Sequence, residues 1–155
     1  MKCTCQFISL YSQLKIAIME IIRLKGTDKK LYTMVGPLVM DADVLKQNNG
    51  YPFKTSEEYT WYIAVEKKKV VGFFPFILKG KHRVYIDNYF IAEDNPDVFD
   101  VLLDAITNDY YEDLDITALV HKRHVDYFKR NHFQCIKDWK NYETMQYNPE
   151  MEVEE

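Results

Sequence analysis

The sequence predicts a single mixed α/β domain, with a mostly antiparallel sheet of six or seven strands, one parallel strand pair, and flanking helices. The chain has 155 residues, 47% of them hydrophobic, which is enough for one core and favours one domain over two. Three strand-like runs follow one another between residues 61 and 91, as in an antiparallel meander. A helix-like segment then separates the run at 83–91 from one at 114–120, and such a crossover makes two strands parallel.

The first elements are a strand at 19–25 and an amphipathic helix at 29–39. Thr27 or Asp28 can cap this helix by accepting its free backbone N–H groups. Gly36-Pro37 is expected to bend or break the helix, because proline removes a backbone donor and clashes with the preceding turn. The apolar positions that share one face of the helix are Leu31, Met34, Val35 and Leu38.

A second helical piece is expected at 41–47, followed by a loop. The strands at 61–65 and 70–78 form a hairpin around a charged turn, and 83–91 adds a third strand. Asn95 and Pro96 are typical of a helix cap and first position, and they begin a helix that extends to about Tyr111. The remaining expected elements are a strand at 114–120, a helix at 124–130 and strands at 133–136 and 142–147.

The predicted domain occupies residues 19–147. Residues 1–18 are interpreted as an N-terminal extension of uncertain status, because polar residues interrupt their apolar run and no small-residue cleavage site follows. Residues 148–155 are acidic and are expected to form a flexible tail.

Charge and cysteine content narrow the classes of function. The formal net charge is −4, which argues against a nucleic-acid partner, because phosphate contacts need clustered Lys and Arg. No apolar run reaches the ~20 residues that a membrane span needs, so no membrane partner is expected. Three cysteines favour a reducing compartment, the cytoplasm. Cys3 and Cys5 have no second ligand pair at metal-site spacing, so no metal is predicted.

Three segments in order resemble the GNAT superfamily of acyl-CoA-dependent N-acyltransferases, over roughly residues 19–147. They are the hairpin WYIAVEKKKVVGFFPF from Trp61, the strand-helix unit VYIDNYFIAEDNPDVFDVLLDAI from Val84, and HVDYFKRNHFQCIKDW from His124. The resemblance implies a GNAT-like sheet whose parallel pair is split. It also implies a small-molecule or peptide amine as acceptor, and a monomer or homodimer.

The resemblance further implies acetyl-CoA or another acyl-CoA as co-substrate, with its pyrophosphate at the start of the helix after Asn95. The family has spaced glycines there, whereas this chain has Asp94, Asn95, Asp97 and Phe99. Several carboxylates occupy the loop, and Asn95 or Asp97 can satisfy the free N–H groups from within. The positions that match the family's cofactor-binding unit are Tyr89, Phe90, Ile91, Asn95, Asp97, Val98, Phe99 and Phe128.

Two positions are candidates for amine chemistry. His121 follows the strand at 114–120, and a histidine there can act as a general base, because its pKa lies near neutrality. The alternative is that His121 and its neighbour His124 are surface residues at a helix start. Asp87 lies in the strand before the loop, where it can bind or deprotonate an amine if it faces the groove. The alternative is that Asp87 and Asn88 face solvent.

Tyr127 is a third catalytic candidate, by resemblance. Many family members place a tyrosine four residues before a Gly-Phe pair, to protonate the leaving thiolate. Here the pair is His132-Phe133 and the tyrosine position holds Phe128, with Tyr127 about 100° away around the helix. Other aromatic residues either line a groove for an apolar or aromatic ligand or pack in the core; they are Tyr51, Phe53, Tyr59 and Trp61.

Three functions follow. The first is an N-acyltransferase that acts mostly by positioning its substrates and by polarising the thioester carbonyl from the strand at 89–91. The second is a non-catalytic binding module of the same fold, suggested by the acidic loop. The third is an acyltransferase with another donor, such as an aminoacyl-tRNA, against which the net charge counts.

Overall fold

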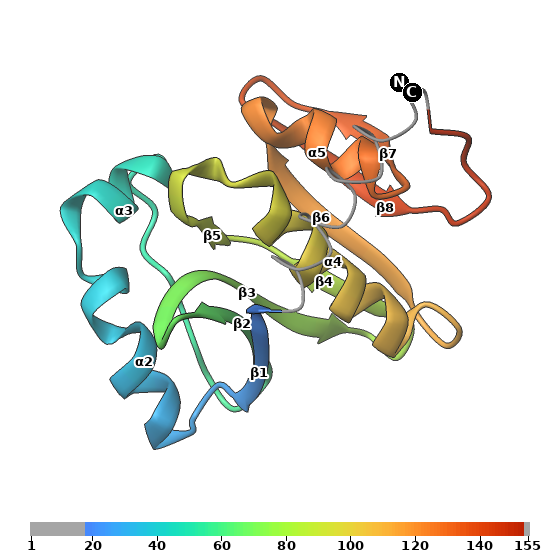
Figure 1. The fold of residues 1–155 in the computed structure, drawn as a ribbon. Coiled ribbons are helices and arrows are strands. Elements are labelled where there is room, and N and C mark those ends of the chain that lie inside the picture. Colours follow the sequence, from blue (N-terminus) through green and yellow to red (C-terminus); the bar gives the residue numbers. More distant parts are fainter. Residues whose placement is uncertain (1–17, 154–155) are drawn as a thin grey trace, which may run out of the picture.

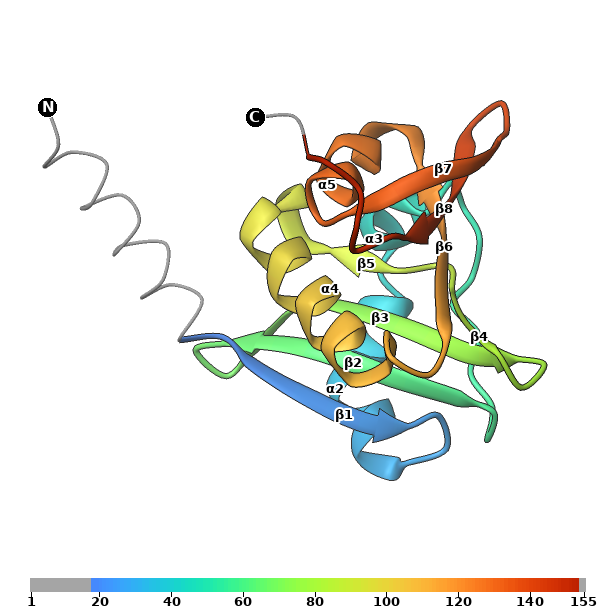
Figure 2. The ribbon, with the colours of Figure 1, turned by 90° about the vertical axis from the view of Figure 1, so that its right-hand side faces the viewer.

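The computed structural model describes residues 18–153, and within them the chain forms one twisted sheet (Figures 1 and 2). Its strands are β1 (Glu20–Lys25), β2 (Tyr59–Glu66), β3 (Lys69–Lys79), β4 (Arg83–Ile86), β5 (Phe90–Ile91), β6 (Asp115–His121), β7 (Phe133–Asp138) and β8 (Tyr142–Tyr147). The order is β1-β2-β3-β4-β6-β8-β7, with β5 paired to β3. Only β4 and β6 pair in parallel among these described strands, which confirms the predicted fold class.

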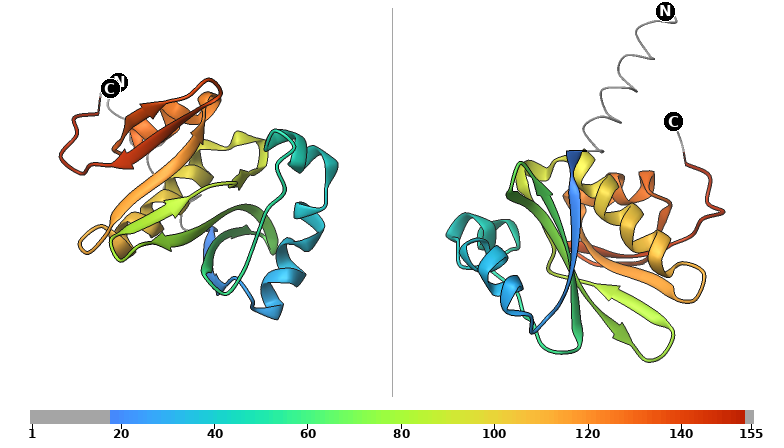
Figure 3. Two further views of the ribbon diagram at one scale, coloured as in Figure 1. Left: turned by 180° about the vertical axis from the view of Figure 1, so that it is seen from behind. Right: turned by 60° about the horizontal axis from the view of Figure 1, so that its bottom comes forward.

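Helices cover both faces of the sheet. They are α2 (Lys29–Val39), α3 (Ala42–Gln47), α4 (Pro96–Tyr110) and α5 (Val125–Arg130), with short 3-10 turns η1 (Ala92–Asp94) and η2 (Lys122–His124). Figure 3 shows α2 and α3 on one side of the sheet and α4 and α5 on the other. The sheet is therefore the middle of three layers, as the predicted order of elements requires.

Helix α2 begins as predicted, because the Asp28 side chain accepts a hydrogen bond from the backbone N–H of Lys30 at 2.8 Å. The expected break at Pro37 is wrong, since α2 continues through it to Val39. Pro37 lies in the last turn, so only the final part of the helix loses a backbone donor. The Met40 N–H then bonds to the Gly36 carbonyl and closes the end.

Alternate residues of β2 supply two separate cores. Trp61 and Ile63 face α2, where they pack with Leu31 and Val35. Tyr62 and Ala64 face the opposite side and belong to the core beneath α4 and α5. Full burial of each large apolar side chain contributes about 1.5–3 kcal/mol. Trp61 is 1% exposed, so it does not line a groove as one interpretation of the sequence allowed.

The predicted strand at 83–91 is interrupted, which corrects the sequence analysis. Asn88 has φ 49°, outside the extended region, and the break separates β4 from β5. Strand β4 pairs with β6 as far as Ile86 and Ala118. Both β4 and β5 pair with β3, and beyond the break Ile91 of β5 pairs with Gly72, while β6 continues beside β8. The sheet therefore opens between β5 and the end of β6, at the split that the resemblance implied.

The segment after β8 contacts the domain. The Asn148 N–H donates to the His132 carbonyl at 2.8 Å, and His132 Nδ1 lies 3.2 Å from the Met151 carbonyl oxygen.

The predicted extension, with Cys3 and Cys5, lies almost entirely outside the described residues. Within residues 18–153, no helix is long and apolar enough to cross a membrane. The same residues contain no group of three His, Cys, Asp or Glu side chains placed to hold a metal.

Candidate functional site

A cleft of about 590 Å³ lies where the sheet opens, and we call it the split-sheet cleft. It is bounded by the end of α3, the β4–β5 connection, the end of β6 and the β7–β8 hairpin. Its lining residues are Asn48, Tyr51, Tyr85, Asp87, Asn88, Leu119, His121, Trp139, Lys140, Asn141, Tyr142 and Thr144. The cleft brings together Asp87 and His121, which are adjacent to different strands in the sequence. Tyr127 lies elsewhere, in a hollow of about 650 Å³ beside Cys135 and Met151.

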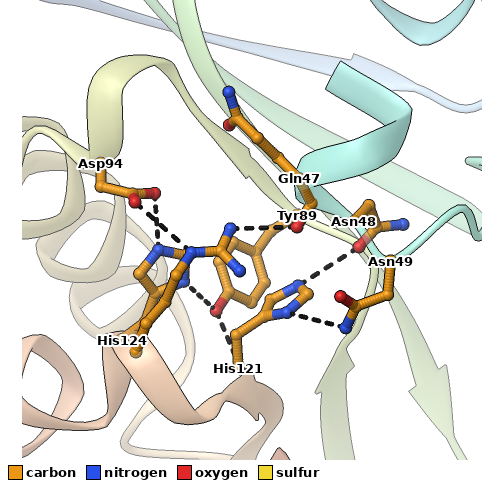
Figure 4. Close-up of polar contacts among 8 residues, drawn as sticks. Gln47, Asn48, Asn49, Tyr89, Asp94, His121 and His124 are labelled. Carbon is orange, nitrogen blue, oxygen red and sulfur yellow. Dashed lines mark hydrogen bonds and ion pairs between the residues drawn. The ribbon is translucent and has the colours of Figure 1, made fainter. Parts of the chain in front are cut away.

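His121 is held in one orientation by two asparagines after α3 (Figure 4). Its Nε2 lies 3.3 Å from Asn48 Oδ1, and its Nδ1 lies 3.5 Å from Asn49 Nδ2. Asn48 Nδ2 donates to the Tyr51 carbonyl at 2.8 Å and to Asn88 Oδ1 at 3.2 Å, so Asn48 Oδ1 must accept from the histidine. This network assigns the proton to His121 Nε2 and leaves a lone pair on Nδ1.

His121 and His124 are buried, so their interpretation as surface residues is wrong. Their exposed fractions are 4% and 2%. Burial, with the positive charge of Arg123 and the proximity of His124, lowers the pKa of His121 to about 4, although Asp94 opposes the shift. His121 is therefore a neutral imidazole at neutral pH, with an unprotonated nitrogen available as a base.

A hydrogen-bonded relay lies behind His121 (Figure 4). His124 Nε2 lies 2.6 Å from Asp94 Oδ1, and its Nδ1 lies 2.7 Å from the Tyr89 hydroxyl. A carboxylate accepts only, so Nε2 carries the proton and Tyr89 donates to Nδ1. The Tyr89 oxygen also accepts the His121 backbone N–H at 3.2 Å. The relay thus joins the loop before α4 to the end of β6.

Burial shifts the pKa values of the relay's two rings in opposite directions. It raises the pKa of Tyr89, which therefore stays a phenol at neutral pH. It lowers the pKa of His124 by more than the hydrogen bond that His124 donates to Asp94 raises it. Both rings are consequently neutral at neutral pH.

Asp87 is half-buried in the break between β4 and β5, rather than on a solvent-facing strand. Burial raises the pKa of its carboxyl group, and the charges of Lys79 and Lys54 oppose that shift. No hydrogen bond from a described residue contributes to the pKa of Asp87. Its carboxylate is thus a candidate to bind an amine in the split-sheet cleft.

Helix α4 is capped from within, as the sequence predicted. Asn95 Oδ1 accepts the Asp97 N–H at 3.0 Å, and the Asn95 carbonyl accepts the N–H groups of Val98 and Phe99 at 3.1 and 3.3 Å. The Asp97 and Val98 N–H groups are among the donors that a helix start otherwise offers to a phosphate. An anion at this helix would have to replace the bonds that Asn95 makes.

Carboxylates also occupy the loop before α4. Glu93 and Asp94 both adopt left-handed φ, at 58° and 49°, where glycine is favoured. Asp94 pairs with Arg123 at 3.4 Å as well as with His124, which keeps Arg123 from a ligand. In this arrangement the residues at the start of α4 do not fit a pyrophosphate.

The other residues that match the family's cofactor unit lie mostly inside the protein. Tyr127 is half-buried and its ring stacks on Phe99 with centroids 5.1 Å apart. The buried members are Tyr89, Phe90, Ile91, Val98, Phe99 and Phe128.

Sequence reasoning missed most of the residues that line the cleft, among them Asn48, Trp139 and Tyr142. Asn48 ends α3, and the other two flank the β7–β8 turn. Loops and turns have no periodicity that marks an inward-facing side chain. The one available signal was Trp139 itself, since a large aromatic residue in a charged turn is unusual.

No protein-family model and no curated protein matches this sequence. Solved structures do match the fold. ElaA from Escherichia coli has a TM-score of 0.65 and 11% identity over 84% of this chain and 99% of its own. An acyl-CoA N-acyltransferase from Pseudomonas aeruginosa has a TM-score of 0.63 and 12% identity over 83% and 99%.

A third similar structure is the N-acetyltransferase PseH of Campylobacter jejuni in complex with acetyl coenzyme A. It has a TM-score of 0.56 and 11% identity over 84% of this chain and 99% of its own. At such low identities these likenesses establish the fold alone. The chain has the GNAT fold, as the ordered sequence segments indicated.

Proposed function

We propose that the protein is an N-acyltransferase that passes an acyl group from an acyl thioester to an amine bound in the split-sheet cleft. The observation that carries the proposal is that Asp87 and His121 line one cleft where β4 and β6 part. The similar structures of an acyl-CoA N-acyltransferase and of PseH with acetyl coenzyme A support this class of reaction.

The two cleft residues have separate roles in this proposal. An amine reaches the protein mostly as an ammonium ion, which the Asp87 carboxylate attracts and orients. The amine must lose a proton before its nitrogen attacks a carbonyl carbon. His121 Nδ1 is the base that accepts this proton, in exchange for its 3.5 Å contact with Asn49 Nδ2. The relay through Tyr89 holds the His121 backbone in place, so Tyr89 is a positioning residue.

Acyl-CoA is the donor to test first, because PseH was solved with acetyl coenzyme A. The start of α4 does not fit the pyrophosphate of this donor, so we expect its affinity to be low. The poor fit of the α4 start to a pyrophosphate also supports a second candidate function, a module that binds an amine and transfers no acyl group. Asn95 then serves only to cap α4, and Asp94 only to hold the loop against η2.

Calorimetric titration with acetyl-CoA and free CoA, followed by a thiol-release assay with a panel of amines, distinguishes the two. An N-acyltransferase requires thiol release that depends on the amine. It also requires that Asp87→Asn lower kcat/KM at least about 100-fold, while the exposed Asp115→Asn stays within about twofold. Amine binding without thiol release from any acyl thioester would instead establish the binding module.

A further inference from the structure

We propose that the amine that binds the split-sheet cleft is carried on an aromatic ring. This inference rests on the proposed function only in taking the cleft as the acceptor site. Four aromatic side chains line the cleft together with Asp87. They are Tyr51, Tyr85, Trp139 and Tyr142.

Trp139 is fixed at the cleft before any ligand binds. Its Nε1–H donates to Thr144 Oγ1 at 2.9 Å, and the Lys137 ammonium lies 3.9 Å from the ring centroid. The side chain is nevertheless 47% exposed. A large indole that is held in place and half exposed is typical of a stacking surface, because little side-chain entropy remains to be lost on binding.

Two tyrosines are held in a similar way. The Tyr142 hydroxyl accepts from Asn49 Nδ2 at 2.7 Å, and its ring lies 4.9 Å from that of His121. Tyr85 has the Lys79 ammonium 3.8 Å from its ring centroid. Three of the four rings that line the cleft are thus oriented by protein contacts, which lowers the cost of binding a planar ligand.

The polar groups of the cleft suit the amine end of such a ligand. Of the described residues that line the cleft, Asp87 is the acidic one and Lys140, exposed on the hairpin turn, is the basic one. The cleft volume, about 590 Å³, lies within the range for a small-molecule site. The cleft therefore has room for a compact ring and an acidic side chain for its amino group.

An aromatic ring is favoured over a saturated ring of the same size. Aromatic pairs gain edge-to-face or offset-stacked contacts beyond their buried area, which corresponds to a severalfold to tenfold gain in affinity. Benzylamine and cyclohexylmethylamine form a matched pair for this comparison, since they share the amine and the ring size. We expect benzylamine to bind about tenfold more tightly.

Tryptophan fluorescence can report this binding without an acyl donor. The chain has two tryptophans; Trp61 is 1% exposed in the core, and Trp139 is at the cleft. Each amine is titrated while emission is followed, and dissociation constants are confirmed by ligand-observed NMR. Trp139→Leu is expected to weaken benzylamine at least about fivefold and cyclohexylmethylamine less than about twofold. Trp139→Phe is expected to retain most of the preference.

Controls separate stacking from misfolding. Ile136→Ala changes another exposed side chain of β7 that does not line the cleft, and is expected to alter neither affinity. Asp87→Asn is expected to weaken both amines alike. Equal affinities for the two amines, or an unchanged preference in a folded Trp139→Leu variant, would overturn the ring inference. Transfer to aliphatic amines alone would also overturn it and leave the proposed function standing. Preferential binding of benzylamine without any acyl transfer would support the ring inference and contradict the proposed N-acyltransferase function.

Discussion

The hydroxyl oxygen of Tyr89 lies 2.7 Å from Nδ1 of His124, and both side chains are almost fully buried. These residues come from opposite sides of the split in the sheet, one before β5 and one in η2. Their hydrogen bond ties the two sides together directly behind His121. Buried polar side chains therefore fill the inner part of the split. The split-sheet cleft, on the other side of His121, remains accessible.

Tyr89→Phe is expected to destabilise the protein by about 1–3 kcal/mol, because it leaves the buried His124 Nδ1 and the His121 N–H without the Tyr89 oxygen. Urea unfolding measures the change. The matched control is Tyr127→Phe, which keeps the ring that stacks on Phe99 and is expected to cost less than about 0.5 kcal/mol. Equal effects of the two variants would show that the relay contributes nothing specific.

Stability is expected to fall as the pH is lowered from 7 to 5. In the unfolded chain His121 titrates near ~6.5, whereas burial lowers its pKa to about 4 in the folded protein. Between these values the unfolded state binds a proton that the folded state does not. The free energy of unfolding is therefore highest above the pKa of the unfolded chain. It falls as the pH is lowered towards the folded pKa, by about 2 kcal/mol at pH 5. His124, whose pKa is also lowered, acts in the same direction.

Unfolding by urea at several pH values measures the slope of the unfolding free energy against pH. His121→Gln is expected to flatten it, while His82→Gln, at an exposed turn position, is expected to leave it unchanged. The same slope in His121→Gln as in the original protein would mean that folding leaves the pKa of His121 unchanged.

Gly72→Ala is expected to destabilise the protein by about 1–3 kcal/mol, because an added Cβ would lie 2.8 Å from Val98 Cγ1 and 3.0 Å from the Phe90 carbonyl oxygen. The clash pushes the start of α4 away from β3. Gly36→Ala is the control, since nothing lies within 4 Å of an added Cβ and alanine favours the helix. Thermal unfolding should therefore move in opposite directions for the two variants.

Asp87→Asn is expected to raise the Tm by about 2 °C while it lowers acyl transfer. Burial raises the pKa of Asp87, so the folded state holds its charge at a free-energy penalty that the amide avoids. Calorimetry at pH 7 measures the gain, which should vanish at a pH low enough to protonate the carboxyl group. A lower Tm would mean that the carboxylate has a stabilising partner.

Asp94→Gly is expected to tighten the binding of CoA about tenfold. The change removes a carboxylate from the loop, releases Arg123, and places glycine at a left-handed φ of 49°. Calorimetric titration with CoA measures the affinity. Asp113→Gly is the control, at an exposed turn after the C-terminal end of α4. If CoA still fails to bind, the Asp94 carboxylate is not by itself what excludes a pyrophosphate.

Local features could be predicted well from the sequence. The spacing of Leu31 and Val35 marked the buried face of α2, and Asn95-Pro96 marked the start of α4. These features depend on contacts within a few residues, which is why periodicity and capping rules detect them. The ordered segments also predicted the split parallel pair, since a crossover helix constrains strand direction.

The arrangement of the cleft could be predicted only in part. Asp87 and His121 were selected as candidates, but the burial of His121 depends on Asn48, 73 residues away. The roles of Trp139 and Tyr142 depend on how the β7–β8 hairpin folds beside β6. A sequence pattern records neither contact, because each joins segments that are remote along the chain.

The sequence by itself determined the order of strands and helices, the polarity of each face and the acidic, self-capped start of α4, because these depend on the composition of short segments. Only the tertiary structure decided where the strand at 83–91 breaks, which histidines are buried and which aromatic rings line the split-sheet cleft. Those outcomes depend on packing between distant segments, where the free energy of a buried polar group is set by the partner that folding brings to it.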